Sequence, residues 1–238
     1  DYNSLHATPY YAPPPTGLTN KTLAEKVCFL GDSHARYLAY QSEQMVKNIT
    51  LNTTGCKDLA QRDNEIYSYD IFPYEAMKFA DEWFPLPTNY SDCDVVFVSF
   101  GHHDAGFPRE KPTPPLTYVN NVLQVARRLE NITKASSRIY VLSCNINGFD
   151  ERVLKCKDWR VPSLIDVYNA RLQSLTTRLG DGTFQFTTPT LNRTYYLDNN
   201  DIMDPLWDSA EDWYHQCHNS VRPLAQRILS LLKTVPQK

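Results

Sequence analysis

Two runs of apolar residues place the strongest constraint on how this chain can fold. "KVCFLG" ends at Gly31 and "DVVFVSFG" ends at Gly101, and each run is almost continuously apolar. A strand that is apolar on both sides needs cover on both faces, which is typical of a parallel sheet packed between helices. The two runs therefore predict buried strands.

Helical patterns alternate with the strand patterns along the chain. The predicted strands are Lys26–Leu30, Ile49–Asn52, Asp94–Gly101, the "RIYVLSC" segment and the "TFQFT" segment. One predicted helix covers Ser33–Lys47, and three more are marked by apolar stripes: Tyr118, Val122, Val125 and Leu129; Leu164, Tyr168, Leu172, Leu175 and Leu179; and Val221, Leu224, Ala225, Ile228 and Leu232. The alternation predicts an α/β fold, a three-layer α/β/α sandwich around a mainly parallel five-stranded sheet with ligands at the carboxyl ends of its strands.

Length and charge limit the domain organisation and the partners. The 238 residues fit one domain over residues 25–238, preceded by an extended, proline-rich arm over residues 1–24. A net charge of -3 without a basic block argues against nucleic acid as a partner, and no apolar run approaches the length of a membrane span. We expect a monomer that acts on a neutral partner without a cofactor.

Cysteines and glycosylation motifs both indicate the secretory pathway. Six cysteines without a C-x-x-C pair favour disulfides over a zinc knuckle. One set of pairs joins Cys144 to Cys156 and Cys56 to Cys217, which leaves Cys28 with Cys93 at poorly matching strand positions; other pairings stay open. Asn-x-Ser/Thr motifs begin at Asn20, Asn48, Asn52, Asn89, Asn131 and Asn192. We interpret the chain, which starts at Asp1, as a mature secreted protein or a luminal domain cut from its anchor.

Ser33 is the candidate nucleophile, because it follows a buried strand and a glycine and begins a predicted helix. The alternative is that Asp32 or Ser33 merely caps that helix. A serine nucleophile needs a histidine base held by a carboxylate, and "EDWYHQCHNS" supplies Asp212 and His215 just before the last helix. A solvated loop histidine is the plain alternative there, and His218 competes for the role of base.

The motifs carry a resemblance to a known superfamily. "GDSH" after the first strand and "DWYH" before the last helix resemble the SGNH (GDSL-type) hydrolases, which implies a triad of Ser33, His215 and Asp212. "GDSHAR", "GHHD" and "DWYHQC" are similar to segments of plant trichome-birefringence-like proteins. "LGDSHAR" is similar to SGNH domains fused to bacterial sugar O-acyltransferases. The resemblance therefore implies chemistry on carbohydrate O-acetyl groups.

One block departs from the superfamily pattern. His103 in "GHHD" stands where the G-x-N-D block has its asparagine, and Gly55 best matches the glycine of the second block. The resemblance then implies an oxyanion hole of the Ser33 and Gly55 backbone N–H groups with His103. Gly55 as a plain turn glycine and Arg36 as a solvated arginine are the competing interpretations. Candidate substrate-binding residues are Arg36, His102, Asp104 and Trp213, and further aromatic side chains that could stack on sugars are Tyr37, Tyr67, Tyr69, Trp207 and Tyr214.

A metal site is a weaker hypothesis. His102, His103, Asp104 and His215 are suitable zinc ligands, but adjacent residues that leave a strand point to opposite sides. We therefore predict no metal. The function predicted is a secreted serine esterase that hydrolyses acetyl esters on a polysaccharide or glycan. The alternatives are an O-acetyltransferase that uses the same triad and a catalytically inactive glycan-binding protein on the same scaffold.

Overall fold

The computed structural model describes residues 21–47, 71–82, 88–106, 109–145, 159–180, 183–203, 218–232 and 234–236. Its strands are β1 (Lys21–Leu23), β2 (Val27–Gly31), β3 (Tyr74–Ala76), β4 (Val95–Ser99), β5 (Arg138–Leu142), β6 (Thr176–Arg178), β7 (Phe184–Phe186), β8 (Thr194–Leu197) and β9 (Thr234–Pro236). Its helices are α2 (Ser33–Val46), α4 (His102–Ala105), α5 (Pro115–Ile132), α6 (Pro162–Gln173), α7 (Asn200–Met203) and α8 (His218–Ser230), and η2 (Thr88–Asp92) is a 3-10 turn.

The described strands form a seven-stranded central sheet in the order β3-β2-β4-β5-β8-β7-β6. The first five strands in this order are parallel, and β7 and β6 continue the sheet in antiparallel fashion beyond β8. The predicted α/β fold with a mainly parallel sheet is confirmed. The predicted number of five strands is wrong, because two short antiparallel strands extend the five parallel ones.

The side on which the chain adds the next parallel strand changes at β2. After β2 the chain moves to β3 on one side and then returns to β4 on the other side. In open α/β sheets a ligand crevice forms at such a switch, outside the carboxyl ends of the two strands. The switch in this sheet lies between β2 and β4.

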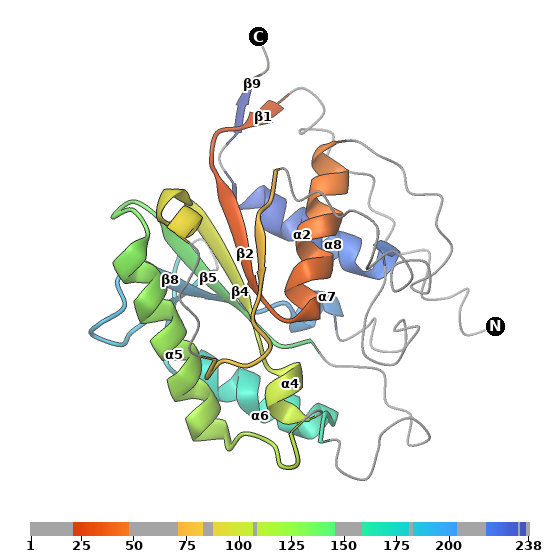
Figure 1. Cartoon of the computed structure of the whole chain (residues 1–238), viewed down its shortest axis with the longest axis vertical. Helices are drawn as coiled ribbons and strands as arrows, with labels where there is room; N and C mark the ends of the chain where they lie inside the picture. Colours follow the sequence, from red (N-terminus) through yellow and green to blue (C-terminus); the bar gives the residue numbers. More distant parts are fainter. Residues whose placement is uncertain are drawn as a thin grey trace, which may run out of the picture.

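Alternate residues of the strands face two separate helical layers. In β2, Val27 and Phe29 belong to the core under α2 and α8, whereas Cys28 and Leu30 belong to the core under α5 and α6. Figure 1 shows the central strands between these two helical layers. The continuous apolar runs therefore mark strands that are covered on both faces.

The structure corrects one predicted helix and adds a strand. Helix α6 ends at Gln173 instead of continuing to Leu179, and Thr176–Arg178 forms β6. The backbone N–H of Thr187 donates to the carbonyl of Leu175 at 2.9 Å, so sheet pairing replaces the last helical turn. "TFQFT" contains β7 as predicted, but it is not the last strand of the sheet, because β8 follows it and pairs with β5.

Both ends of the described chain meet in a small second sheet. Strand β1 pairs antiparallel with β9, with Lys21 opposite Pro236. Strand β1 lies within the predicted arm, whose residues 1–20 lie outside the described residues, as does the predicted strand Ile49–Asn52. Among the helices that the structure describes, none has the length and hydropathy to cross a membrane.

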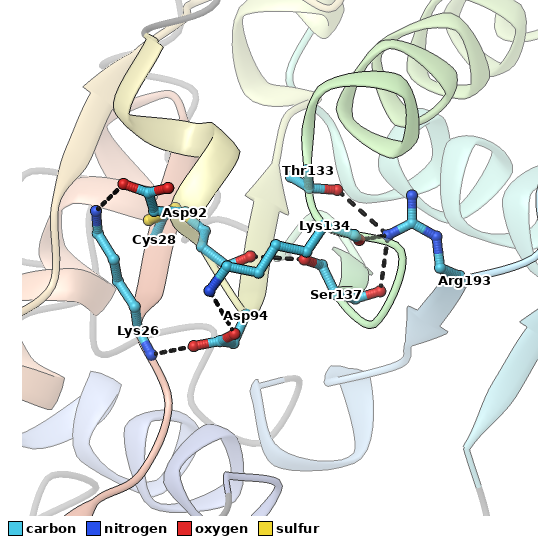
Figure 2. A network of polar contacts seen from close by, with 9 residues as sticks. Lys26, Cys28, Asp92, Asp94, Thr133, Lys134, Ser137 and Arg193 are labelled. Carbon is cyan, nitrogen blue, oxygen red and sulfur yellow. Dashed lines mark hydrogen bonds and ion pairs between the residues drawn. A yellow bond between two sulfur atoms is a disulfide. The ribbon is translucent and has the colours of Figure 1, made fainter.

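A polar network fixes the amino-terminal ends of β2 and β4 (Figure 2). The carboxylate of Asp94 accepts the backbone N–H of Lys26 and the ammonium of Lys134, each at 2.9 Å. The hydroxyl of Ser137 donates to the carbonyl of Cys93 at 2.6 Å, and Arg193 donates to the carbonyls of Lys134 and Ser137. These contacts connect the segments that precede β2, β4, β5 and β8. They lie at the amino-terminal ends of these strands, whereas Ser33 follows the carboxyl end of β2.

A disulfide lies beside this network and confirms one of the three predicted pairs. Cys28 in β2 is bonded to Cys93, with 6.0 Å between their Cα atoms. Cys93 precedes β4 and follows η2, so the mismatch of strand positions expected for this pair does not apply. Cys144 is a buried free thiol, so the predicted Cys144–Cys156 bridge is wrong. Cys56, Cys156 and Cys217 lie outside the described residues.

We predict that the Cys28–Cys93 bond stabilises the fold strongly, because it closes a loop across 65 residues. A cross-link of this span contributes about 4 kcal/mol. The double variant Cys28→Ala/Cys93→Ala should lose about this free energy of unfolding in urea titrations. Cys144→Ala is the control, since it removes a buried thiol without removing a cross-link. Equal losses in the two variants would contradict the prediction.

Candidate active site

The carboxyl end of β2 turns sharply into α2 at Gly31. Gly31 has a φ of 145°, and a Cβ there would lie 2.0 Å from the carbonyl oxygen of Ser99 in β4. The next residue, Asp32, donates its backbone N–H to that same carbonyl at 3.2 Å. Only glycine fits at this corner, because a side chain would collide with the backbone of the neighbouring strand.

Asp32 and Ser33 have separate positions at the start of α2. The carboxylate of Asp32 accepts the backbone N–H of His34 at 2.9 Å, so Asp32 is the N-cap. Ser33 is the first residue of this 14-residue helix and is half-buried. Of the two capping alternatives, the structure selects Asp32. Ser33 stands where the helix dipole favours negative charge.

A second glycine corner follows β4. Gly101 has a φ of 128°, and a Cβ there would lie 2.7 Å from the sulfur of Cys144. The short helix α4 begins directly after it with His102. The "GDSH" and "GHHD" segments therefore occupy equivalent positions at the carboxyl ends of adjacent strands, at the topological switch of the sheet.

The two corners meet through a pair of histidines. The rings of His34 and His102 stack with 3.7 Å between their centroids and an angle of 14° between their planes. His102 is almost fully buried, at 3 % exposure, whereas His34 is half-buried. Sequence reasoning missed His34 as a member of this site, although the shared strand-glycine-histidine pattern of the two segments was the available signal.

Two buried carboxyl groups, Asp32 and Asp104, belong to the same two segments as the histidine pair. Burial raises the pKa of Asp32 to about 7, with a further increase from the charge of Asp104 and opposing effects of hydrogen bonds and Arg160. Burial likewise raises the pKa of Asp104 to about 6, although hydrogen bonds from Ala80 and Thr113 oppose it. Paired titratable groups with displaced pKa values are typical of functional sites.

The remaining described candidates spread around this centre. The ring of His103 lies edge-on to Phe79, 5.7 Å between centroids, on another side of α4 from the histidine stack. The guanidinium of Arg36 lies 5.2 Å from the ring centre of Tyr37. The carboxylate of Asp104 points into the core, where it accepts the N–H of Ala80 and the hydroxyl of Thr113. Asp104 therefore holds neighbouring segments together, and its predicted contact with substrate stays untested.

Several candidates lie outside the described residues. These are Gly55, Asp212, Trp213 and His215 and the stacking candidates Tyr67, Tyr69, Trp207 and Tyr214, so the triad and the complete oxyanion hole stay predictions. Within the described part of the chain, no cluster of three or more His, Cys, Asp or Glu side chains is arranged to bind a metal ion. His102 and His103 contact different neighbours, although both lie in helix α4 and not, as expected, at the end of a strand.

The glycosylation candidates that can be placed lie away from the glycine corners. Asn131 at the end of α5 and Asn192 before β8 are exposed. The backbone N–H of Asn192 donates to the carboxylate of Glu130, the residue before Asn131. The two asparagines therefore lie close together, near the amino-terminal end of β8. Asn89 lies in η2, and Asn20, Asn48 and Asn52 fall outside the described residues.

Comparisons with known proteins agree with this fold. No protein-family model and no curated protein matches the chain. A solved Streptococcus pneumonia structure described as a platelet activating factor matches with a TM-score of 0.54 and 13% identity, over 96% of this chain and 91% of that one. The chain therefore shares an α/β fold with that solved structure.

Two further solved structures are similar with lower TM-scores. A peptidoglycan O-acetylesterase matches at 0.42 with 14% identity, over 67% of this chain and 47% of that one. A Lactobacillus plantarum protein matches at 0.46 with 16% identity, over 88% of this chain and 97% of that one. At these identities the likeness concerns the fold alone.

We predict that Gly31→Ala destabilises the protein by more than about 3 kcal/mol, because it combines a strained φ with a backbone clash. Gly180→Ala is the matched control, since a Cβ there meets no atom within 4 Å. Urea titrations of both variants provide the measurement. A Gly31→Ala protein as stable as the Gly180→Ala protein would show that the corner differs from the one described.

We also predict that the ionisation of Asp32 decreases the free energy of unfolding as the pH rises from 4 to 7. The folded protein holds the Asp32 proton up to a pKa of about 7, whereas the unfolded chain releases it near 3.8, so stability is full below pH 4 and decreases through pH 7. The upper limit of this effect is roughly 4 kcal/mol.

The test is the free energy of unfolding as a function of pH. Asp32→Asn keeps a good N-cap residue and should flatten the decrease between pH 4 and 7 by at least about 1 kcal/mol. Asp166→Asn, at an exposed position in α6, should leave the profile as it is. Parallel profiles for wild type and Asp32→Asn would contradict the prediction.

Proposed function

We propose that this chain is a serine esterase that removes acetyl groups from a carbohydrate, with Ser33 as the nucleophile. The observation that carries the proposal is the position of Ser33 at the first residue of α2, directly after the Gly31 corner and at the switch between β2 and β4. Ligands of open α/β sheets bind at this place. The SGNH-type fold and the sequence motifs agree with an acyl-serine mechanism.

The proposed base and its carboxylate come from the segment that leads into α8. Asp212 and His215 precede His218, the first residue of that helix. Helix α8 packs against α2, and side chains of both helices, including Leu38 and Leu224, share one core. The proposed triad would thus come from the first turn of α2 and from the segment before α8, and these two helices contact each other.

The proposed reaction proceeds through an acetyl-serine. The Ser33 hydroxyl oxygen attacks the ester carbonyl carbon while His215, oriented by Asp212, takes its proton. Backbone N–H groups of Ser33 and Gly55, with His103, would stabilise the oxyanion. The sugar hydroxyl leaves with the proton from His215, and water then cleaves the acetyl-serine to acetate and free serine.

An extracellular location belongs to the same proposal. The Cys28–Cys93 disulfide is consistent with an oxidising compartment, and so are the exposed glycosylation motifs at Asn131 and Asn192. An acetylated polysaccharide or glycan outside the cell would then be the substrate.

We predict that Ser33→Ala lowers ester turnover by roughly 10⁴-fold or more and leaves the fold intact, as the loss of a triad nucleophile does. The measurement is acetate release from acetylated xylan, mannan and pectin, with circular dichroism as the test of folding. Ser174→Ala removes a hydroxyl that only closes α6, through its bond to the carbonyl of Arg171, and serves as the control. Wild-type turnover in folded Ser33→Ala protein would remove the mechanism.

The same assay separates hydrolysis from transfer. With a small activated acetyl ester, free acetate should remain the main product when oligosaccharide acceptors are added. Acetylation of the acceptor with suppressed acetate release would assign the site to an acetyltransferase.

A further inference from the structure

Trp159 is a large aromatic side chain that the fold leaves in solvent. It is 48% exposed, and the other large hydrophobic side chains exposed in the described part of the chain, Leu116, Ile132 and Val167, are aliphatic residues of α5 and α6. An exposed tryptophan presents an apolar face together with one N–H donor. Both features suit a partner that is apolar on one face and polar at its rim.

The backbone at Trp159 is fixed to the first turn of α6. The carbonyl of Trp159 accepts the N–H of Val161 at 2.7 Å. The carbonyl of Val161 in turn accepts the N–H groups of Leu164 and Ile165 at 3.1 and 3.2 Å, and Pro162 begins the helix. The indole therefore projects from a segment that is anchored by hydrogen bonds, which reduces the entropy lost when a ligand binds.

Helix α6 is attached to the glycine corner after β4. It packs against α4, as Figure 1 shows, and the hydroxyl of Tyr168 donates to the carbonyl of Asp104 at 3.2 Å. The side chain of Asn169 bonds to the backbone N–H and carbonyl of Cys144, each at 2.8 Å. Since α4 carries His102, the stacking partner of His34, these contacts connect α6 to the start of α2.

The charge of Arg160, the residue after Trp159, acts on the start of α2. Its positive charge opposes the burial that raises the pKa of Asp32, the residue before Ser33. Trp159 precedes Arg160 directly, and both residues lead into α6, the helix that packs against α4.

We propose that Trp159 is a carbohydrate-stacking residue that binds a sugar ring beside the acetylated one, at the edge of the Ser33 site. The indole face packs on the C–H groups of a pyranose, and its N–H meets the ring hydroxyls. The proposal rests on the proposed esterase function and narrows its substrates to chains of at least two sugars. An acetylated small alcohol could not use this contact.

The kinetic test compares a sugar substrate with a small ester. Relative to wild type, Trp159→Ala should lower kcat/KM on acetylated xylo- or manno-oligosaccharides at least tenfold more than on 4-nitrophenyl acetate, with the loss in KM. Trp159→Phe should recover part of it, because a smaller ring still stacks. Leu116→Ala, which removes a more exposed side chain from α5, is the control and should match wild type. Equal losses on both substrates, or none, would overturn the proposal.

A binding measurement separates this proposal from the esterase function. In the Ser33→Ala background, calorimetric titration with the same oligosaccharides should show affinity that Trp159→Ala weakens at least tenfold. If Ser33→Ala abolishes acetate release while Trp159→Ala binds normally, the stacking proposal alone fails. If Ser33→Ala retains activity, the nucleophile is wrong, and the Trp159 effect on affinity still tests the stacking. A change from dimer to monomer on Trp159→Ala, without loss of sugar affinity, would overturn the proposal and assign the face to a contact between two copies.

Discussion

The close approach of Gly31 to the Ser99 carbonyl is the constraint on which the candidate site depends. A Cβ at Gly31 would lie 2.0 Å from that oxygen, so the end of β2 can pass β4 only without a side chain. Gly101 gives β4 a similar corner against Cys144. Two adjacent strands thus turn at once into helices, and the turns bring His34 onto His102. The catalytic serine proposed here gains its position from this backbone geometry.

The two ends of the sheet divide stability and chemistry between them. At the amino-terminal ends of β2 and β4, Asp94 accepts hydrogen bonds from Lys26 and Lys134, and the Cys28–Cys93 bond lies beside them. At the carboxyl edge, burial raises the pKa of Asp32 and Asp104, so ionising either carboxyl costs stability. Functional sites commonly retain such unfavourable groups, and the rest of the fold compensates for them. The disulfide and the Asp94 network thus lie at the other end of the same strands.

Local patterns predicted much of the architecture, and their failures have physical causes. The runs that became β2 and β4, and helix α2 from Ser33, were recognisable because burial on both faces and a capped start leave a direct mark on composition. The end of α6 was wrong because pairing of Thr176–Arg178 with β7 outweighed an apolar stripe that reads equally well as helix. The Cys28–Cys93 pair was undervalued because η2 positions Cys93 before β4, which strand register alone does not reveal.

The sequence by itself determined the fold class and the place of Ser33 at a strand-to-helix turn, because hydrophobic periodicity and helix-start signals are properties of neighbouring residues. The tertiary structure alone decided which distant groups meet. It stacked His34 on His102, enclosed Asp104, and packed α6, the helix that follows the exposed Trp159, against α4. Such contacts depend on strand order and on the packing of helices across the sheet, and these arise from the summed burial of many side chains, which no short stretch of sequence contains.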